Sequence, residues 1–494
     1  MGNVGQGHRP WDCLGRRRTI ISGSRVERGP YGKTELSPGV GNKALWTSQA
    51  KVPLLTQPAR NSPPAKTRDP SRGSVRKFAA GAAGIAIILF AYYAVTWRSI
   101  AGFITAMGVG SNLFSDFVDY YYPMGETVFR TGLPVPGFLY SPFIAIVLAV
   151  FPPLGLTASL VLWGILQVLF VFLYLLLFRR LVPAGLPSQL LFVALVLSSF
   201  PLLLNLMAGQ VSVFIIVPLL GMLVFNGRGH RAAAAGLLAF AVSFKFYPII
   251  FLAPFAARRD TRFLLFAAAA CSAFLFVIPG AFLGGGDTLH FCGALLDSFR
   301  DSDWVVANPH SYYFPHLVLR LADAMGHDAQ ALLPLLRWIA YGVAAANMGL
   351  ILLVERARLR HAGLWSFQLV FLTIPFVLKT SWPHDFVFLS FTQALLAWRL
   401  LEGKTAAPGT ETEGRPSHAS AWRERIPDRR AAVAFFLLLA SIVLSNIVFF
   451  NLFGDPHGYG FYGFLFWADL LLLVALYVEL MPSALRRLRQ PRTA

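Results

Sequence analysis

The sequence predicts an all-α integral membrane protein, a polytopic bundle of about ten to twelve transmembrane helices. Of its 494 residues, 56% are hydrophobic and only 14% are charged, whereas soluble domains usually carry about 25% charged residues. Apolar runs of about 20 residues, the length that crosses a bilayer core, recur between Phe78 and Leu480. Lys and Arg fall between alternate runs, as in cytoplasmic loops. These observations exclude a soluble globular domain.

The N-terminal segment 1–77 is expected to be a disordered, basic cytoplasmic tail. It holds 15 Lys or Arg against 4 Asp or Glu, and it is rich in Pro, Gly and Ser without an apolar period. Such a segment buries too little apolar surface to offset its chain entropy. No apolar run of signal-peptide length precedes Phe78. We expect the tail to lie near anionic membrane lipids rather than to bind nucleic acid.

The basic residues set the expected order of the crossings, with both termini in the cytoplasm. The first crossing is Phe78–Trp97, so the acidic stretch 98–140 lies outside. Residues 141–151 are apolar but too short to cross, which predicts an interfacial helix on the outer face. The further crossings are expected at 157–178, 186–206, 211–225, 263–282, 331–354, 364–378, 386–400, 431–451 and 462–480.

The apolar run Ala232–Ala257 differs from the others because basic residues stand at both ends, Arg231 before it and Arg258 after it. A single crossing would place one of these charges outside, against the positive-inside rule. Lys245 and Pro248 also interrupt the middle of the run. We therefore expect two half-helices that enter the membrane and return to the same side. One such hairpin, without an internal repeat, disfavours a transporter built from paired halves.

The segments expected after the tail are a large transmembrane domain at 78–400 and a polar cytoplasmic linker at 401–430. A C-terminal pair of transmembrane helices at 431–481 and a basic cytoplasmic tail at 482–494 complete the chain.

Polar residues that call for an explanation gather on the expected outer side, since charged groups at membrane depth are costly and usually functional. The first group follows the first crossing and contains Asp116 and Asp119 with Tyr120 and Tyr121. Two carboxylates and neighbouring hydroxyls suit binding a substrate hydroxyl and accepting its proton. The plain alternative is an exposed loop with ordinary acidic residues and interfacial tyrosines.

Lys245 and Tyr247 form the second group, at the break of the hairpin. A lysine in an apolar segment needs an anion or water nearby, and a phosphate would serve. The alternative is a lysine that extends to a lipid headgroup. Weaker polar groups on the outer side contain Gln210, Asn308, Ser311, Ser381, Trp382 and His384.

Other site chemistries find no support in the sequence. Cys13, Cys271 and Cys292 lie far apart, in no disulfide or metal-binding spacing. No phosphate-binding loop, dinucleotide fingerprint or nucleophile elbow occurs in a suitable context. We expect no metal and no cofactor.

The order of the outer motifs resembles a known family. The motifs are Ser115-Asp116-Phe117 with Tyr120-Tyr121, Tyr140-x-Pro142, Pro152-Pro153-Leu154, Gly209-Gln210, Lys245-x-Tyr247-Pro248 and Ser381-Trp382-x-His384. Over residues 78–400 the chain is similar to family 87 glycosyltransferases, polyprenyl-phosphate-mannose-dependent α-mannosyltransferases of the multi-span GT-C fold. Where relatives often carry a second His after Ser-Trp-x-His, this chain has Asp385, which marks a different acceptor or sugar.

The resemblance implies an inverting transfer of a hexose, mannose above all, from a polyprenyl-phosphate sugar to a lipid or glycan acceptor. Asp116 matches the family's catalytic carboxylate and would act as general base. The position implies an active site in a periplasmic first loop, on the outer face of the cell inner membrane. The substrate-binding candidates are Asp119, Tyr120, Tyr121, Gln210, Lys245, Tyr247, Asn308, Ser311, Ser381, Trp382 and His384.

Two other classes remain open from the sequence. A transporter or flippase of lipid-linked glycans would show inverted halves and charged groups along a path through the membrane midplane. A non-catalytic scaffold, or a glycan polymerase of another fold, would not depend on a first-loop carboxylate.

Overall fold

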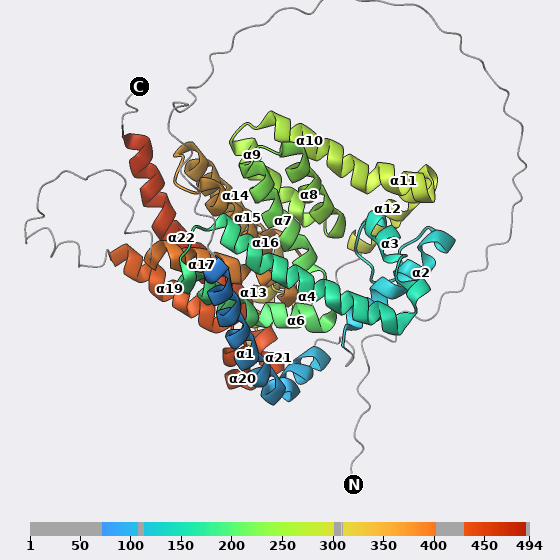
Figure 1. Cartoon of the computed structure of the whole chain (residues 1–494), viewed down its shortest axis with the longest axis horizontal. Coiled ribbons are helices and arrows are strands. Elements are labelled where there is room, and N and C mark those ends of the chain that lie inside the picture. Colours follow the sequence, from blue (N-terminus) through green and yellow to red (C-terminus); the bar gives the residue numbers. More distant parts are fainter. Residues whose placement is uncertain (1–71, 107–112, 301–307, 309, 402–428, 491–494) are drawn as a thin grey trace, which may run out of the picture. The chain divides into compact units, whose positions relative to one another are not determined.

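The computed structural model describes residues 72–106, 113–300, 308, 310–401 and 429–490 (Figure 1). The described residues form helices joined by turns and loops, and the only strand-like feature among them is an isolated bridge between Ser199 and Asn446. The predicted all-α polytopic membrane class is confirmed. The predicted tail up to residue 71, and most of the linker at 401–430, lie outside the described residues. The predicted domain boundaries stay predictions.

Within the described ranges, five helices are long and apolar enough to cross a membrane, or six if one bent pair counts as a crossing. They are Ala80–Ser99 within α1 (Arg72–Ala106), α4 (Leu156–Leu181), the continuous run α10 (Thr261–Ser272), η5 (Ala273–Val277) and α11 (Ile278–Leu283), the run η7 (Gln330–Leu332) and α14 (Leu333–Arg356), and α22 (Phe464–Arg489). This number is below the expected ten to twelve because several expected crossings are broken into shorter helices.

The expected crossing 186–206 is one of these broken segments. It forms α5 (Leu186–Leu197) and α6 (Phe200–Ala208), and Ser199 caps α6 by accepting a hydrogen bond from the Leu202 amide. The chain then turns by 119° into α7 (Ser212–Gly227). The turn needs the left-handed conformation of Gly209, which has φ of 71°. The segment expected to cross at 186–206 is therefore divided into two helices between Leu197 and Phe200.

The segment 232–257 is divided into two helical stretches at Lys245, and its predicted entry into the membrane stays a prediction. Helix α8 (Arg231–Phe244) ends at Lys245, whose backbone is extended, and η4 (Tyr247–Leu252) and α9 (Ala253–Ala257) follow. Arg231 Nε at the start of the hairpin lies 3.2 Å from Asp260 Oδ2 just after its end. The two ends therefore meet on one side, and Lys245 stands at the break.

Short helices build the region that was expected outside the membrane. They are η2 (Phe117–Tyr121), α2 (Tyr122–Thr131), α3 (Pro142–Leu148), η3 (Pro152–Leu154), α12 (Gly285–Arg300) and α13 (Phe314–Ala324). Ser141 caps α3, and its hydroxyl donates a 2.6 Å hydrogen bond to the Ser243 carbonyl in the last turn of α8. This bond ties the short helix expected at 141–151 to the break of the hairpin.

The C-terminal part of the chain from residue 362 adds the remaining helices of the bundle. Its elements are α15 (Ala362–Phe371), α16 (Ile374–Val377), η8 (Pro383–Phe388), α17 (Leu389–Leu401), α19 (Arg429–Ser445), α20 (Ile447–Phe453) and α21 (Pro456–Phe461), followed by α22. The C-terminal helices α19 and α22 pack against each other and against α17. Helix α22 continues to Arg489, so the first residues of the expected C-terminal tail are helical.

Candidate active site

A buried ion pair lies at the break of the hairpin. Lys245 Nζ donates a 2.6 Å hydrogen bond to Asp385 Oδ1 and lies 3.4 Å from His384 Nε2. The Lys245 side chain is 16% exposed and that of Asp385 is 1% exposed. Asp385 Oδ2 accepts a 3.2 Å hydrogen bond from the Trp382 amide at the start of η8. The end of α8 and the start of η8 are thus joined by charge.

The charges of this pair follow from their surroundings, which lie outside the membrane-spanning helices. Burial alone would raise the pKa of Asp385, but Lys245 and His384 more than offset it and lower the pKa below its ordinary value. Burial, together with Lys245, lowers the pKa of His384 to about 3. His384 is therefore neutral at neutral pH, and Asp385 is ionised.

A chain of hydrogen bonds leads from Asp385 into the bundle. Ser212 Oγ donates to Asp385 Oδ1 at 3.4 Å, and the Ser212 amide donates to Asn205 Oδ1 at 2.9 Å. Asn205 Nδ2 donates to Gln167 Oε1 at 3.1 Å, and Gln167 Nε2 donates to the Gln210 carbonyl at 2.6 Å. This network fixes the turn between α6 and α7 against α4, because each buried polar group has a partner.

Gln210 also holds two tyrosines. Its Oε1 atom accepts hydrogen bonds from the Tyr121 hydroxyl at 3.2 Å and from the Tyr140 hydroxyl at 3.3 Å. The two hydroxyls lie 2.6 Å apart. All three side chains are buried. Gln210 and Tyr121 thus contact each other and Tyr140, and their predicted role in substrate binding stays a prediction.

Asp116 stands at the edge of this cluster, directly before η2. Its side chain is buried at 9% exposure, while Asp119 one turn further is exposed. Burial, and then the charge of Asp119, raise the pKa of Asp116 to about 7, although Lys245 opposes the shift. Asp116 therefore lies within electrostatic range of Lys245. A carboxylate with this pKa suits proton transfer near neutral pH.

The loop before Asp116 is held in an unusual conformation. Phe114 has φ of 61°, which is uncommon for a residue with a side chain. Its amide donates a 2.7 Å hydrogen bond to the Met207 carbonyl, and Trp163 Nε1 donates a 2.9 Å hydrogen bond to the Gly209 carbonyl. The ring of Phe117 packs on Trp163, with centroids 4.8 Å apart. The segment that leads to Asp116 is therefore fixed to the α6–α7 turn.

Asn308 and Ser311 lie in a second polar cluster. Ser311 Oγ is 3.1 Å from His316 Nδ1 and donates a 3.4 Å hydrogen bond to the Lys379 carbonyl. The Tyr312 amide donates to the Ser381 carbonyl at 2.9 Å. The segment that carries Ser311 and Tyr312 is thus joined to the segment that carries Trp382 and His384.

Arg320 holds this second cluster to the C-terminal helices. Its guanidinium donates to the carbonyls of Asn308 and Ser311 at 3.1 and 3.2 Å. It also donates to the carbonyls of Phe461 and Gly460 at 3.0 and 3.4 Å. The end of α21 is therefore joined through Arg320 to the segment that contains Asn308 and Ser311.

Two further candidates, Tyr120 and Tyr247, are half-buried. Tyr120 packs against Gly137, and Tyr247 lies within electrostatic range of Asp385 and Tyr140. Several buried polar atoms have no hydrogen-bond partner within the described residues. Among them are Ser115 Oγ, Ser381 Oγ, Tyr312 Oη and His316 Nε2.

Sequence reasoning missed some of the residues that build the site. Asp385 was read only as a departure from a family pattern, although it forms the central ion pair. Gln167 and Arg320 were not singled out. Gln167 had a usable signal, since an amide inside a long apolar helix needs a buried partner. No group of three His, Cys, Asp or Glu side chains in the described part of the chain is placed to hold a metal ion.

The fold and this site define a polytopic membrane protein with a buried cluster of charged and hydroxyl groups between its helices. The family model described as glycosyltransferase family 87 matches residues 138–381. Over this region the chain belongs to glycosyltransferase family 87, and it is a glycosyltransferase. No curated protein and no solved structure matches the chain. The matched region contains Gln210 and Lys245, whereas Asp116 and Asp385 lie outside it.

Proposed function

We propose that this glycosyltransferase moves a hexose, with mannose as the first sugar to test, from a polyprenyl-phosphate donor to a hydroxyl of a lipid or glycan acceptor. The reaction takes place on the periplasmic face of the inner membrane, and both termini lie in the cytoplasm. The basic residues at the two ends of the hairpin, Arg231 and Arg258, support this orientation. The outer side then carries Asp116 and the break at Lys245.

In the proposed step, Asp116 accepts the proton of the acceptor hydroxyl as its oxygen attacks the anomeric carbon. The bond between that carbon and the phosphate oxygen breaks, and its electron pair leaves with the polyprenyl phosphate. A single displacement inverts the anomeric centre. The leaving phosphate is a stable anion, so the step needs charge stabilisation more than a strong acid.

Lys245 and His384 are the groups proposed to hold the phosphate. Lys245 supplies positive charge at the break of the hairpin, and neutral His384 supplies a hydrogen bond. Asp385 already pairs with Lys245. The donor phosphate therefore shares the lysine with Asp385, and Asp385 positions the cation for it.

The other candidates divide into two roles. Tyr121 and Gln210 are positioning residues, because their polar atoms are used within the buried network. Asp119, Tyr120 and Tyr247, whose side chains are exposed or half-buried, are proposed to contact substrate. Asn308, Ser311, Ser381 and Trp382 are proposed to form the sugar or acceptor side, where buried Ser381 Oγ has no partner among the described residues.

The observation that carries the proposal is the buried Asp116 carboxyl with a pKa near 7, close to a lysine at a membrane break. The test is transfer of radiolabelled mannose from polyprenyl-phosphate mannose to a membrane lipid extract by the purified full chain. We expect Asp116→Asn to lose at least about 10²-fold in rate, as expected for a missing general base. Glu126→Gln, which removes an exposed carboxylate from α2, is the matched control and should keep full activity.

Each outcome bears on a separate part of the proposal. Full activity of folded Asp116→Asn together with loss in Asp119→Asn would move the base to Asp119. No transfer by the wild type from any of several polyprenyl-phosphate sugars would reject the donor class.

A further inference from the structure

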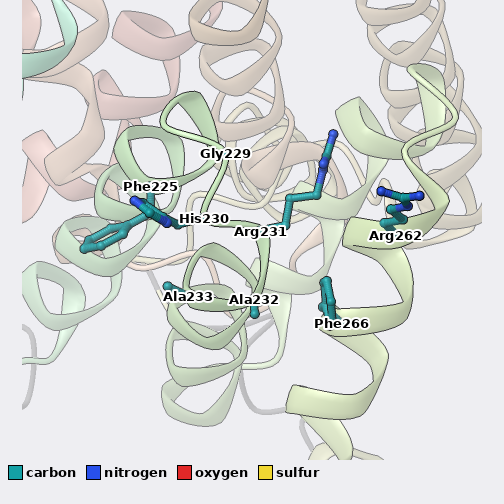
Figure 2. Close-up of a pocket in the computed structure, with 8 residues that line it drawn as sticks. All are labelled: Phe225, Gly229, His230, Arg231, Ala232, Ala233, Arg262 and Phe266. Carbon is teal, nitrogen blue, oxygen red and sulfur yellow. The ribbon is translucent and has the colours of Figure 1, made fainter. Parts of the chain in front are cut away.

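A pocket lies at the end of α8 that is opposite to Lys245. It is formed where α7 ends, α8 begins and α10 begins, and its lining residues are Phe225, Gly229, His230, Arg231, Ala232, Ala233, Arg262 and Phe266 (Figure 2). Helix α8 has 14 residues, so the pocket is about 20 Å from the break at Lys245. It is therefore separate from the candidate active site.

The pocket carries positive charge. Figure 2 shows the side chains of Arg231 and Arg262 on neighbouring helices, with Phe266 one turn further along α10. Arg231 is bound to Asp260, and Asp260 also caps α10 by accepting from the Phe263 amide at 3.3 Å. Arg262 is exposed. Two guanidinium groups against one carboxylate leave a net positive charge.

The backbone adds to this charge. Helix α8 begins at the pocket without a side-chain cap, and the first amides of a helix carry partial positive charge, whereas the start of α10 is already capped by Asp260. Phosphate groups are the anions that such helix starts and arginines bind together.

The apolar part of the pocket indicates what carries the phosphate. Phe225 and Phe266 are exposed beside the arginines. Phe266 belongs to the run Thr261–Leu283, which is long and apolar enough to cross the membrane. The pocket thus lies where a crossing helix starts, at the level of lipid headgroups. A free phosphate would contact only the arginines, whereas a phospholipid would contact both the arginines and the exposed phenylalanines.

We infer that this pocket binds the phosphate of an anionic phospholipid on the side of the membrane opposite to the active site. Its headgroup phosphate contacts Arg231 and Arg262, and an acyl chain lies along Phe266. The basic loops around α7, α8 and α10 favour this lipid class, because anionic lipids bind basic pockets between transmembrane helices.

The experiment measures lipid retained by the purified full chain in detergent, by native mass spectrometry, with phosphatidylglycerol or phosphatidylcholine added. The wild type should retain phosphatidylglycerol in preference to phosphatidylcholine. Arg262→Ala should bind it about fivefold more weakly, which corresponds to about 1 kcal/mol for one arginine at a membrane surface. Arg487→Ala removes an exposed arginine from the end of α22 and should leave binding unchanged.

Three results would overturn the inference. Equal retention of the two lipids would remove the preference for an anion. An equal effect of Arg262→Ala and Arg487→Ala would mean a general effect of charge. Displacement of phosphatidylglycerol by an equal concentration of inorganic phosphate would make the pocket a free-phosphate site. None of these readouts depends on sugar transfer. The lipid-binding inference is therefore tested independently of the proposed function.

Discussion

The buried ion pair between Lys245 and Asp385 allows a quantitative test of how the site is built. Its charged atoms are 2.6 Å apart, and its side chains are 16% and 1% exposed. Unit charges about 4 Å apart attract by about 4 kcal/mol at an effective dielectric constant of about 20. Replacing Asp385 by Asn leaves the lysine charge without its counter-ion. We expect Asp385→Asn to lower the free energy of unfolding by about 3–5 kcal/mol, the usual cost of breaking a buried pair.

A double variant separates stability from function. In Lys245→Met/Asp385→Leu both charges are absent, and apolar replacement of a whole buried pair is often neutral for stability. Most of the lost stability should return, while sugar transfer should not, since the donor phosphate has lost its cation. Unfolding in denaturant within mixed micelles gives the stability, and the mannose-transfer assay gives the activity.

An exposed pair on the other side of the hairpin provides the control. Arg231 and Asp260 are 42% and 20% exposed at 3.2 Å, so their attraction is worth at most about 1 kcal/mol. Asp260→Asn keeps a side-chain oxygen that can cap α10. If Asp385→Asn unfolds at the same denaturant concentration as Asp260→Asn, or if the double variant is as unstable as Asp385→Asn, the reasoning about the buried pair is refuted.

Further outcomes are expected from other parts of the structure. Burial raises the pKa of Asp116 from 3.8 to about 7. Because a general base must be deprotonated, kcat/KM should fall as the pH drops through about 7. A flat profile from pH 5 to 8 would contradict this. Arg320→Lys should lower the thermal midpoint, since an ammonium cannot reach all four carbonyls that the guanidinium contacts, and an unchanged midpoint would show that these contacts contribute nothing. Gly209→Ala should lower the free energy of unfolding by about 1–3 kcal/mol, because φ is 71° and an added Cβ would lie 3.0 Å from Phe114 Cβ. The control is Gly84→Ala, whose added Cβ meets no atom within 4 Å, and it should not lower the stability.

The membrane class followed from the sequence because transfer of a segment into lipid depends on the residues of that segment alone. The apolar runs and the basic loops between them gave the all-α polytopic class. The hairpin was also predictable, since Arg231, Lys245 and Arg258 stand at its ends and middle in one continuous segment. The polar groups with Asp116 and Lys245 were identified for the same local reason, the cost of charge beside an apolar run.

Several features of the site could not be read from the chain in one dimension. Asp116 and Asp119 are three residues apart and chemically alike, and only packing makes one buried and the other exposed. The break of the expected crossing 186–206 lies at Ser198 and Ser199, which contact Asn446 and Ile447 far along the chain.

The central ion pair shows the difference between the two levels most directly. Lys245 and Asp385 are 140 positions apart, and no local pattern connects them. Likewise, no local pattern connects Gln210 with Tyr121 and Tyr140, whose hydroxyls donate to its side-chain oxygen. The sequence by itself determined the all-α polytopic membrane class and which segments carry polar groups, because both are local properties of free energy. Which polar groups meet, and which remain open to a substrate, was decided by the tertiary structure, because burial and pairing depend on neighbours that are distant along the chain.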